Sequence, residues 1–208
     1  GALSVISPRQ FKTLTPDVIA SMSPEQRNAL PPAALNPAAN AAPTNTGNAS
    51  ALAGALTGWN IDKVPANSFN NFKPKDAAKL SPETFSAMNP EQFKAMPANA
   101  FTGFKPDQVA ALSPQAFSAM KPAQMVSLPT NAFGSFNTEQ LGALPAAAFG
   151  AMKPTQVGAM PPAAMASMSP QQVGALPATA VAGLKADQVG AMPPAAFAGM
   201  QSAQVGAL

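Results

Sequence analysis

The chain has 208 residues, a net charge of +3 and only 10% charged residues, and it contains 24 Pro but no Cys, His or Tyr. Without Cys or His it lacks the thiolate and imidazole ligands of zinc, copper, haem and iron–sulfur sites, and the Ser/His and Cys/His pairs of nucleophilic catalysis. The weak positive charge forms no basic run, and Pro or polar residues interrupt every apolar stretch, so the sequence indicates neither nucleic-acid binding nor a membrane span.

Residues 1–35 form an N-terminal block of eight-residue repeats, or octads. Large apolar residues recur every eight positions at Ile6, Leu14, Met22 and Leu30. Each is followed by a Ser-Pro, a Thr-Pro or, after Leu30, a Pro-Pro pair. Because Gly1 already lies inside a repeat, we expect the chain to be a piece of a longer protein whose targeting segment lies outside it.

Residues 36–56 are an insert, rich in Pro, Asn and Ala, that returns the chain to the repeat with its phase shifted by two residues. Its first part, Asn36–Ser50, has the composition of an exposed loop.

Residues 57–208 are nineteen consecutive octads. Position 8 is always Leu, Met, Phe or Val, position 5 is apolar throughout, and position 7 is Ala, Gly or Ser from residue 81 onward. Fifteen octads carry Pro at position 1 or 2. A period this regular predicts a solenoid, in which stacked coils bury the apolar positions.

A second, longer period of two octads overlies the first. From Asn89 onward, alternate octads carry Gln at position 4, and the octads between them carry Ala there, usually followed by Phe. The Gln residues are Gln92, Gln108, Gln124, Gln140, Gln156, Gln172, Gln188 and Gln204. This alternation predicts a sixteen-residue coil made of two unlike octads.

Each octad carries the start signals of a short helix. Ser, Thr or Asn at position 1 is an N-cap, Pro at position 2 fits the first turn, and Gln at position 4 completes a capping box, as in Ser169-Pro170-Gln171-Gln172. The following Pro ends the helix, which is too short to be stable alone. We therefore expect an all-α miniature solenoid of very short Pro-capped helices; a β-solenoid with Pro-marked corners is the alternative.

Five lysines at position 1 are candidate binding residues, and we expect them along one edge of the solenoid: Lys73, Lys105, Lys121, Lys153 and Lys185. A solubilising edge is the simpler explanation of these lysines; the alternative is that the edge binds an acidic polysaccharide or another cell-surface component. The sequence indicates no catalytic, cofactor or metal site, since acidic residues are sparse and a narrow solenoid offers no cleft in which two of them would converge.

The repeat pattern L-[ST]-P-x-Q-[VF]-x-A-[LM] resembles octapeptide arrays in very large secreted bacterial surface proteins of the adhesin type. An example is Met168-Ser169-Pro170-Gln171-Gln172-Val173-Gly174-Ala175-Leu176. The resemblance implies an extracellular or cell-surface location and carries over no functional residues. We therefore expect a non-enzymatic structural protein (a stalk, a sheath or a filament subunit) that associates with itself end to end or laterally. The alternative is an adhesin-like binding module that uses the lysine edge or the insert.

Overall fold

The computed structural model describes residues 49–56, 61 and 64–208, so the N-terminal block and most of the insert lie outside the described part. The described residues belong to one compact unit, Gly47–Leu208. Their regular structure is entirely helical, which confirms the helical repeat solenoid and leaves the β-solenoid alternative without support. Inside the sequence predicted as insert, Ala49–Ala55 forms a helix, α4, that packs against α5 at Pro74–Ala77.

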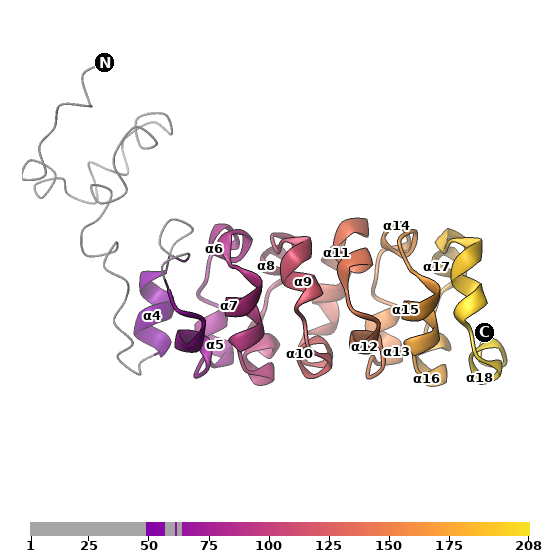
Figure 1. The fold of residues 1–208 in the computed structure, drawn as a ribbon, viewed down its shortest axis with the longest axis horizontal. Coiled ribbons are helices and arrows are strands. Elements are labelled where there is room, and N and C mark those ends of the chain that lie inside the picture. Colours follow the sequence, from indigo (N-terminus) through magenta and orange to yellow (C-terminus); the bar gives the residue numbers. More distant parts are fainter. Residues whose placement is uncertain (1–48, 57–60, 62–63) are drawn as a thin grey trace, which may run out of the picture. The chain divides into compact units, whose positions relative to one another are not determined.

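From residue 66 onward every octad contains one helix (Figure 1). In chain order these are η3 (Ala66–Phe69), α5 (Pro74–Ala77), α6 (Pro82–Ala87), α7 (Pro90–Ala95), η4 (Ala98–Gly103), α8 (Pro106–Ala110), α9 (Pro114–Ser118), α10 (Pro122–Ser127), η5 (Thr130–Ser135), α11 (Thr138–Ala143), α12 (Ala146–Phe149), α13 (Pro154–Val157), α14 (Pro162–Met165), α15 (Pro170–Ala175), α16 (Ala178–Val181), α17 (Ala186–Ala191), η6 (Pro194–Gly199) and α18 (Ser202–Val205).

The helix boundaries follow the sequence signals, and α15 shows how. The Ser169 hydroxyl accepts the N–H of Gln172 at 3.2 Å, and Pro170 occupies the first helical position. The helix ends at Ala175, and its C-cap residue Leu176 is extended, with φ of −62° and ψ of 136°. An extended residue before each new start turns the chain into the next octad, as expected before Pro. Octads that begin with Pro at position 1 lack this side-chain cap, and four of them form 3₁₀ helices, η3 to η6.

Helices stack on the helix three octads further along the chain. Thus α5 packs on η4, α7 on α9 and α14 on α17, and the two helices of each pair begin three octads apart. Gln side chains also reach carbonyls in the octad four units back, as Gln188 reaches Val157 and Met160. An octad that touches both its third and its fourth neighbours belongs to a coil of between three and four octads. The expected sixteen-residue coil of two octads is therefore wrong: the alternation repeats every two octads, but the coil does not close on that repeat.

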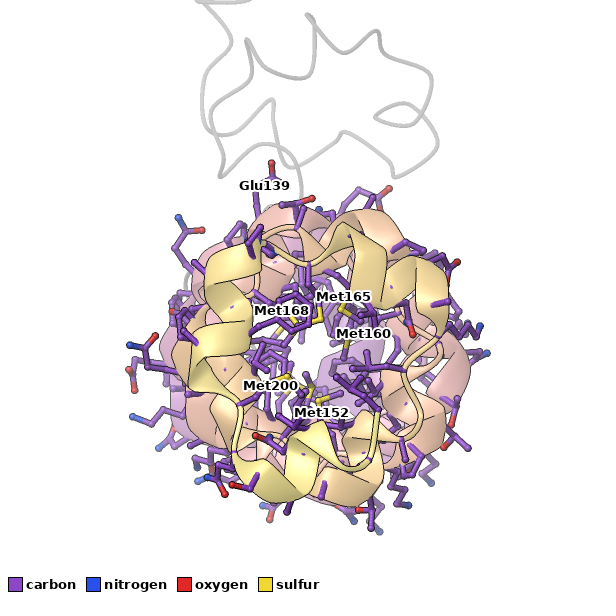
Figure 2. All side chains as sticks on the ribbon, turned by 90° about the vertical axis from the view of Figure 1, so that its right-hand side faces the viewer. Glu139, Met152, Met160, Met165, Met168 and Met200 are labelled. Carbon is purple, nitrogen blue, oxygen red and sulfur yellow. The ribbon has the colours of Figure 1, made fainter. Side chains whose placement is uncertain are left out.

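Positions 5 and 8 form a single apolar core that runs through the unit. Phe85, Phe93, Phe117 and Phe133 at position 5 have no exposed surface. Viewed end on, the helices surround this core, with the labelled Met152, Met160, Met165, Met168 and Met200 pointing inward and Glu139 pointing outward (Figure 2). Since a helix of a single turn or so cannot persist alone, burial of these side chains between coils is what stabilises the array.

Small residues permit the closest contacts between coils. A Cβ atom on Gly183 or Gly199 at position 7 would collide with the backbone of Pro154 or Pro170, in the octad that lies three units earlier. Gly158 lies equally close on the facing side, because a Cβ there would come within 2.7 Å of the Gly183 carbonyl oxygen. The glycines are thus required here by backbone approach rather than by an unusual φ.

Candidate functional site

Each Gln at position 4 completes the first turn of its own helix. In α17 the Oε1 atom of Gln188 accepts the backbone N–H of Lys185 at 2.8 Å. The same bond recurs in α7, where Asn89 N–H donates to Gln92 at 3.0 Å, and in α11, where Asn137 N–H donates to Gln140 at 3.1 Å. This hydrogen bond from the position-1 N–H to the Gln side chain confirms the predicted capping role.

The amide nitrogen of the same side chain makes bonds that the sequence did not predict. Gln188 Nε2 donates to the carbonyl oxygen of Val157 at 2.9 Å and to that of Met160 at 2.7 Å. These carbonyls occupy positions 5 and 8 of the octad four units earlier. One buried amide therefore caps its own helix and bonds two carbonyls of the preceding turn, which satisfies its acceptor and both of its donors.

The same arrangement is repeated in the eight octads from residue 89 onward that carry Gln at position 4, which we call Gln-type octads, except that Gln156 bonds a position-6 carbonyl in place of position 5. Their Gln side chains are buried, between 0% and 4% exposed. The carbonyl pairs that receive them are Ile61/Val64 from Gln92, Ala77/Leu80 from Gln108, Phe93/Met96 from Gln124, Val109/Leu112 from Gln140, Val126/Leu128 from Gln156, Leu141/Leu144 from Gln172, Val157/Met160 from Gln188 and Val173/Leu176 from Gln204. Since each bond spans four octads, the Gln-type octads form two separate series, which we call glutamine ladders. The first joins Gln92, Gln124, Gln156 and Gln188, and the second joins Gln108, Gln140, Gln172 and Gln204.

The octads between them, which we call Ala-type octads, fill the same space differently. Their position 4 is Ala at residues 100, 116, 132, 148, 164, 180 and 196, each at most 1% exposed. Their position 5 is often Phe: Phe101 meets Phe104 of its own octad with ring centroids 4.5 Å apart, and Phe117 meets Phe136 at 5.1 Å. A buried amide at position 4 thus alternates along the chain with a buried methyl group.

Two polar groups near the start of the array interrupt this pattern. Asp76 stands at position 4 of residues 73–80, where its Oδ2 accepts Lys73 N–H at 3.0 Å but its buried Oδ1 has no hydrogen-bond partner. The buried Ser68 hydroxyl, at position 4 of residues 65–72, also lacks a partner. Asp76 thus preserves the cap, but its side chain has no amide N–H of the kind that Gln donates along the ladders.

All five position-1 lysines are exposed, but the ladders divide them. Lys121, Lys153 and Lys185 begin octads of the first ladder, Lys105 begins an octad of the second, and Lys73 begins the octad of Asp76, four octads before that of Lys105. A shallow surface depression is lined by Pro154, Thr155, Gly158, Ala159, Gly183 and Lys185. The structure thus places the lysines in two series rather than along one continuous edge.

The position-3 carboxylates of the described octads point to solvent near helix starts: Glu83, Glu91, Asp107, Glu139 and Asp187. Bonds from its own backbone N–H and from the Ser81 hydroxyl lower the pKa of Glu83 below its ordinary value. A carboxylate at the positive end of a helix interacts favourably with the helix dipole. Within the described residues no three acidic side chains come close enough together to hold a metal ion.

None of the helices in residues 49–56 and 64–208 combines the length and the apolarity that a bilayer crossing requires. No protein-family model matches the chain, and no curated protein matches it.

Proposed function

We propose that this chain is a non-enzymatic structural protein of the cell exterior: a stalk, a sheath or a self-assembling filament subunit. The observation that carries the proposal is the pair of glutamine ladders. In these ladders the buried Gln side chains form hydrogen bonds with the backbone of the array itself, and the same bonds recur along it. An array held by identical nearest-neighbour contacts can be lengthened by duplication without a change of design. Its resemblance to the octapeptide arrays of secreted bacterial surface proteins supports the exterior location.

Electron microscopy of the purified full chain over a range of concentrations tests this role. Nineteen octads at three to four per turn make about five turns, and packed helix layers are about 8–10 Å apart, so the repeat unit is expected to be a rod of about 40–60 Å. Filaments or sheets that lengthen with concentration support a self-assembling subunit, and separate rods at every concentration support a stalk segment. Compact particles that are not rods contradict both.

The location is tested separately, by immunogold labelling of intact and sectioned source cells. Labelling of the cell surface or of the surrounding matrix is expected. Labelling confined to the cell interior contradicts the exterior role, whatever the microscopy of the purified chain shows.

A second candidate function is an adhesin-like module that binds acidic polysaccharide, favoured by the exposed lysines of the first ladder and the depression beside Lys185. Its test is the affinity for polygalacturonate of a variant with Lys121, Lys153 and Lys185 changed to Ser. The control removes the same charge from Lys75, Lys79 and Lys94, which are exposed elsewhere. A loss of binding confined to the first variant supports this module, and an equal loss in both variants indicates only nonspecific attraction.

A further inference from the structure

The shallow depression beside Lys185 lies between two octads of the first ladder. One octad begins with Lys153 and supplies Pro154 and Thr155 to the lining, and the other begins with Lys185 itself. Both lysines are exposed, and ladder glutamines accept their backbone N–H groups at 3.0 Å and 2.8 Å. The volume of the depression is about 480 Å³, within the range of about 300–1,000 Å³ that small-molecule sites occupy.

A pair of glycines shapes this depression. Gly158 at position 6 and Gly183 at position 7 of the facing octad leave its floor without side chains. Position-1 lysines lie four octads apart at two other places in the array, and neither place has such a pair. The corresponding residues are Val126 and Ala151 between Lys121 and Lys153, and Ala78 and Gly103 between Lys73 and Lys105. The depression is therefore a local feature of one step of the first ladder.

The same glycine pair recurs two octads later, without lysines around it. A Cβ atom on Gly174 would come within 2.6 Å of the Gly199 carbonyl oxygen, much as one on Gly158 approaches Gly183. There position 1 of the later octad is Gln201, whose Nε2 atom lies 3.5 Å from the Gly174 carbonyl oxygen, so this side chain reaches across the glycines. The Lys185 ammonium has no hydrogen-bond or ion-pair partner in the described part of the chain, and the depression beside it is open.

The groups that line the depression select the chemistry of a ligand. The backbone N–H groups of Gly158 and Gly183 donate to the carbonyls of Pro154 and Ala180 at 2.9 Å and 3.0 Å. The depression therefore lacks the row of free N–H groups with which a backbone nest holds a phosphate. What remains is the Lys185 ammonium, a hydroxyl and an apolar surface.

The balance of charge around the depression favours an anion. Lys153 and Lys185 are the cations of the octads 153–160 and 185–192, and Asp187 is their one acidic residue. The Oδ1 atom of Asp187 accepts the backbone N–H of Gln188 at 2.9 Å, at the start of its own helix. A ligand that combines a carboxylate, hydroxyl groups and an apolar ring face matches this set, and a uronic-acid unit has all three.

We propose that this depression is a subsite for one uronic-acid unit of an extended acidic polysaccharide. The sugar carboxylate pairs with the Lys185 ammonium, a ring hydroxyl bonds Thr155, and the apolar face of the ring lies on Pro154 and Ala159. Because the depression is shallow and open, the polymer passes over it, toward Lys153 on the same ladder. The inference rests on the second candidate function, the adhesin-like module, and gives that module a defined site in place of general attraction to lysines.

Nuclear magnetic resonance of the ¹⁵N-labelled full chain titrated with trigalacturonate tests the subsite. We expect saturable shifts of the Gly158 and Gly183 amide signals, and none with a galactose trisaccharide, which lacks the carboxylates. Lys185→Gln removes the charge and places at the depression the side chain that Gln201 extends across the other glycine pair. It should weaken binding about fivefold or more. The control, Lys94→Gln, removes the same charge at an exposed position outside the lining and should bind within about twofold of the wild type.

The converse variant is Gln201→Lys, which should uncover the second glycine pair and add shifts at Gly174 and Gly199. If it adds none, a lysine beside a glycine pair is not sufficient and the proposed site is wrong. Equal weakening by K185Q and K94Q, or shifts spread evenly over all five position-1 lysines, refutes the subsite but leaves general attraction to the lysines. Galacturonate that binds as tightly as the trimer indicates a free sugar acid and refutes the polymer. If the wild type also fails to bind polygalacturonate, the adhesin-like module itself is refuted.

Discussion

Gln172→Glu is the sharpest test of the ladders, because it keeps the shape of the side chain and its capping oxygen while removing both amide donors. In the structure Oε1 accepts Ser169 N–H at 2.9 Å, and Nε2 donates to Leu141 and Leu144 carbonyls at 3.0 and 2.8 Å. If Gln172 only caps α15, glutamate should serve as well or better, since a negative charge suits a helix start. If the ladder bonds contribute to stability, glutamate should instead destabilise the array, because its carboxylate is held against two carbonyl oxygens.

Two lost hydrogen bonds cost about 1 kcal/mol each, and leaving buried acceptors unpaired beside a buried charge adds more, so we expect about 3–5 kcal/mol of destabilisation. The assay is urea unfolding at pH 7, followed by far-UV circular dichroism, with the free energy of unfolding compared between variants. The control is Gln171→Glu, which adds the same charge at the exposed neighbouring position of α15. It should change stability by no more than about 0.5 kcal/mol.

The pH dependence gives an independent check on Q172E. The carbonyls raise the pKa of the new carboxyl above its unfolded value, so the folded state binds the proton more tightly. The destabilisation should be complete well above the raised folded pKa and should shrink as the pH falls through it, because the protonated acid can again donate one bond. Equal unfolding free energies for Q172E and Q171E at pH 7 would refute the view that the ladders stabilise the array.

Two further substitutions probe the backbone contacts and the caps, both measured by urea unfolding. Gly183→Ala should destabilise the array by about 1–3 kcal/mol, since its Cβ meets the Pro154 backbone. Gly190→Ala, in open space within α17, should instead be neutral or stabilising by up to about 1 kcal/mol, and equal effects would contradict the close approach. Ser113→Ala removes the hydroxyl that accepts the Ala116 N–H at 3.2 Å and should cost about 1 kcal/mol, whereas the exposed Ser118→Ala should cost less.

The octad unit, its helices and its buried positions could be predicted from the sequence, because caps, Pro and apolar spacing are local signals. Ser169, Pro170 and Leu176 act as their residue types suggest. The coil could not be predicted in the same way. The number of octads per turn depends on the angle between successive helices, and no single residue encodes that angle. The sixteen-residue period does not predict the coil, because it reflects which octads differ in sequence and not which octads contact each other.

One signal for the ladder was nevertheless present. Gln108, Gln124, Gln156 and Gln188 follow Lys at position 1, and a lysine side chain has no acceptor with which to form the other half of a capping box. Gln is retained in those octads at the same two-octad spacing, so capping alone did not account for it. The receiving carbonyls belong to the backbone, which every octad shares, and therefore leave no mark in the sequence.

The alternation of octad types and the four-octad reach of Gln together imply a rule of parity. From Gln124 onward the four-octad reach joins two Gln-type octads. From residue 89 onward the three-octad contact sets a Gln-type octad against an Ala-type octad. Deleting residues 105–112, one octad, breaks the rule, because it sets two Ala-type octads against each other in the three-octad contact and so brings Phe101 opposite Phe133. It also leaves the Ala77/Leu80 carbonyls facing an Ala-type octad.

Deleting residues 105–120, two octads, preserves the rule, because Gln124 then takes over the Ala77/Leu80 carbonyls that Gln108 bonded. Overpacking costs about 1–3 kcal/mol at each ring pair, so the smaller deletion should be the more damaging one, by several kcal/mol in urea unfolding and with a broader transition. The larger deletion should unfold as cooperatively as the full chain, with a slightly smaller dependence on urea because less surface is buried. If stability instead falls in proportion to the number of octads removed, the two octad types are interchangeable, and their alternation is a relic of duplication rather than a requirement of packing.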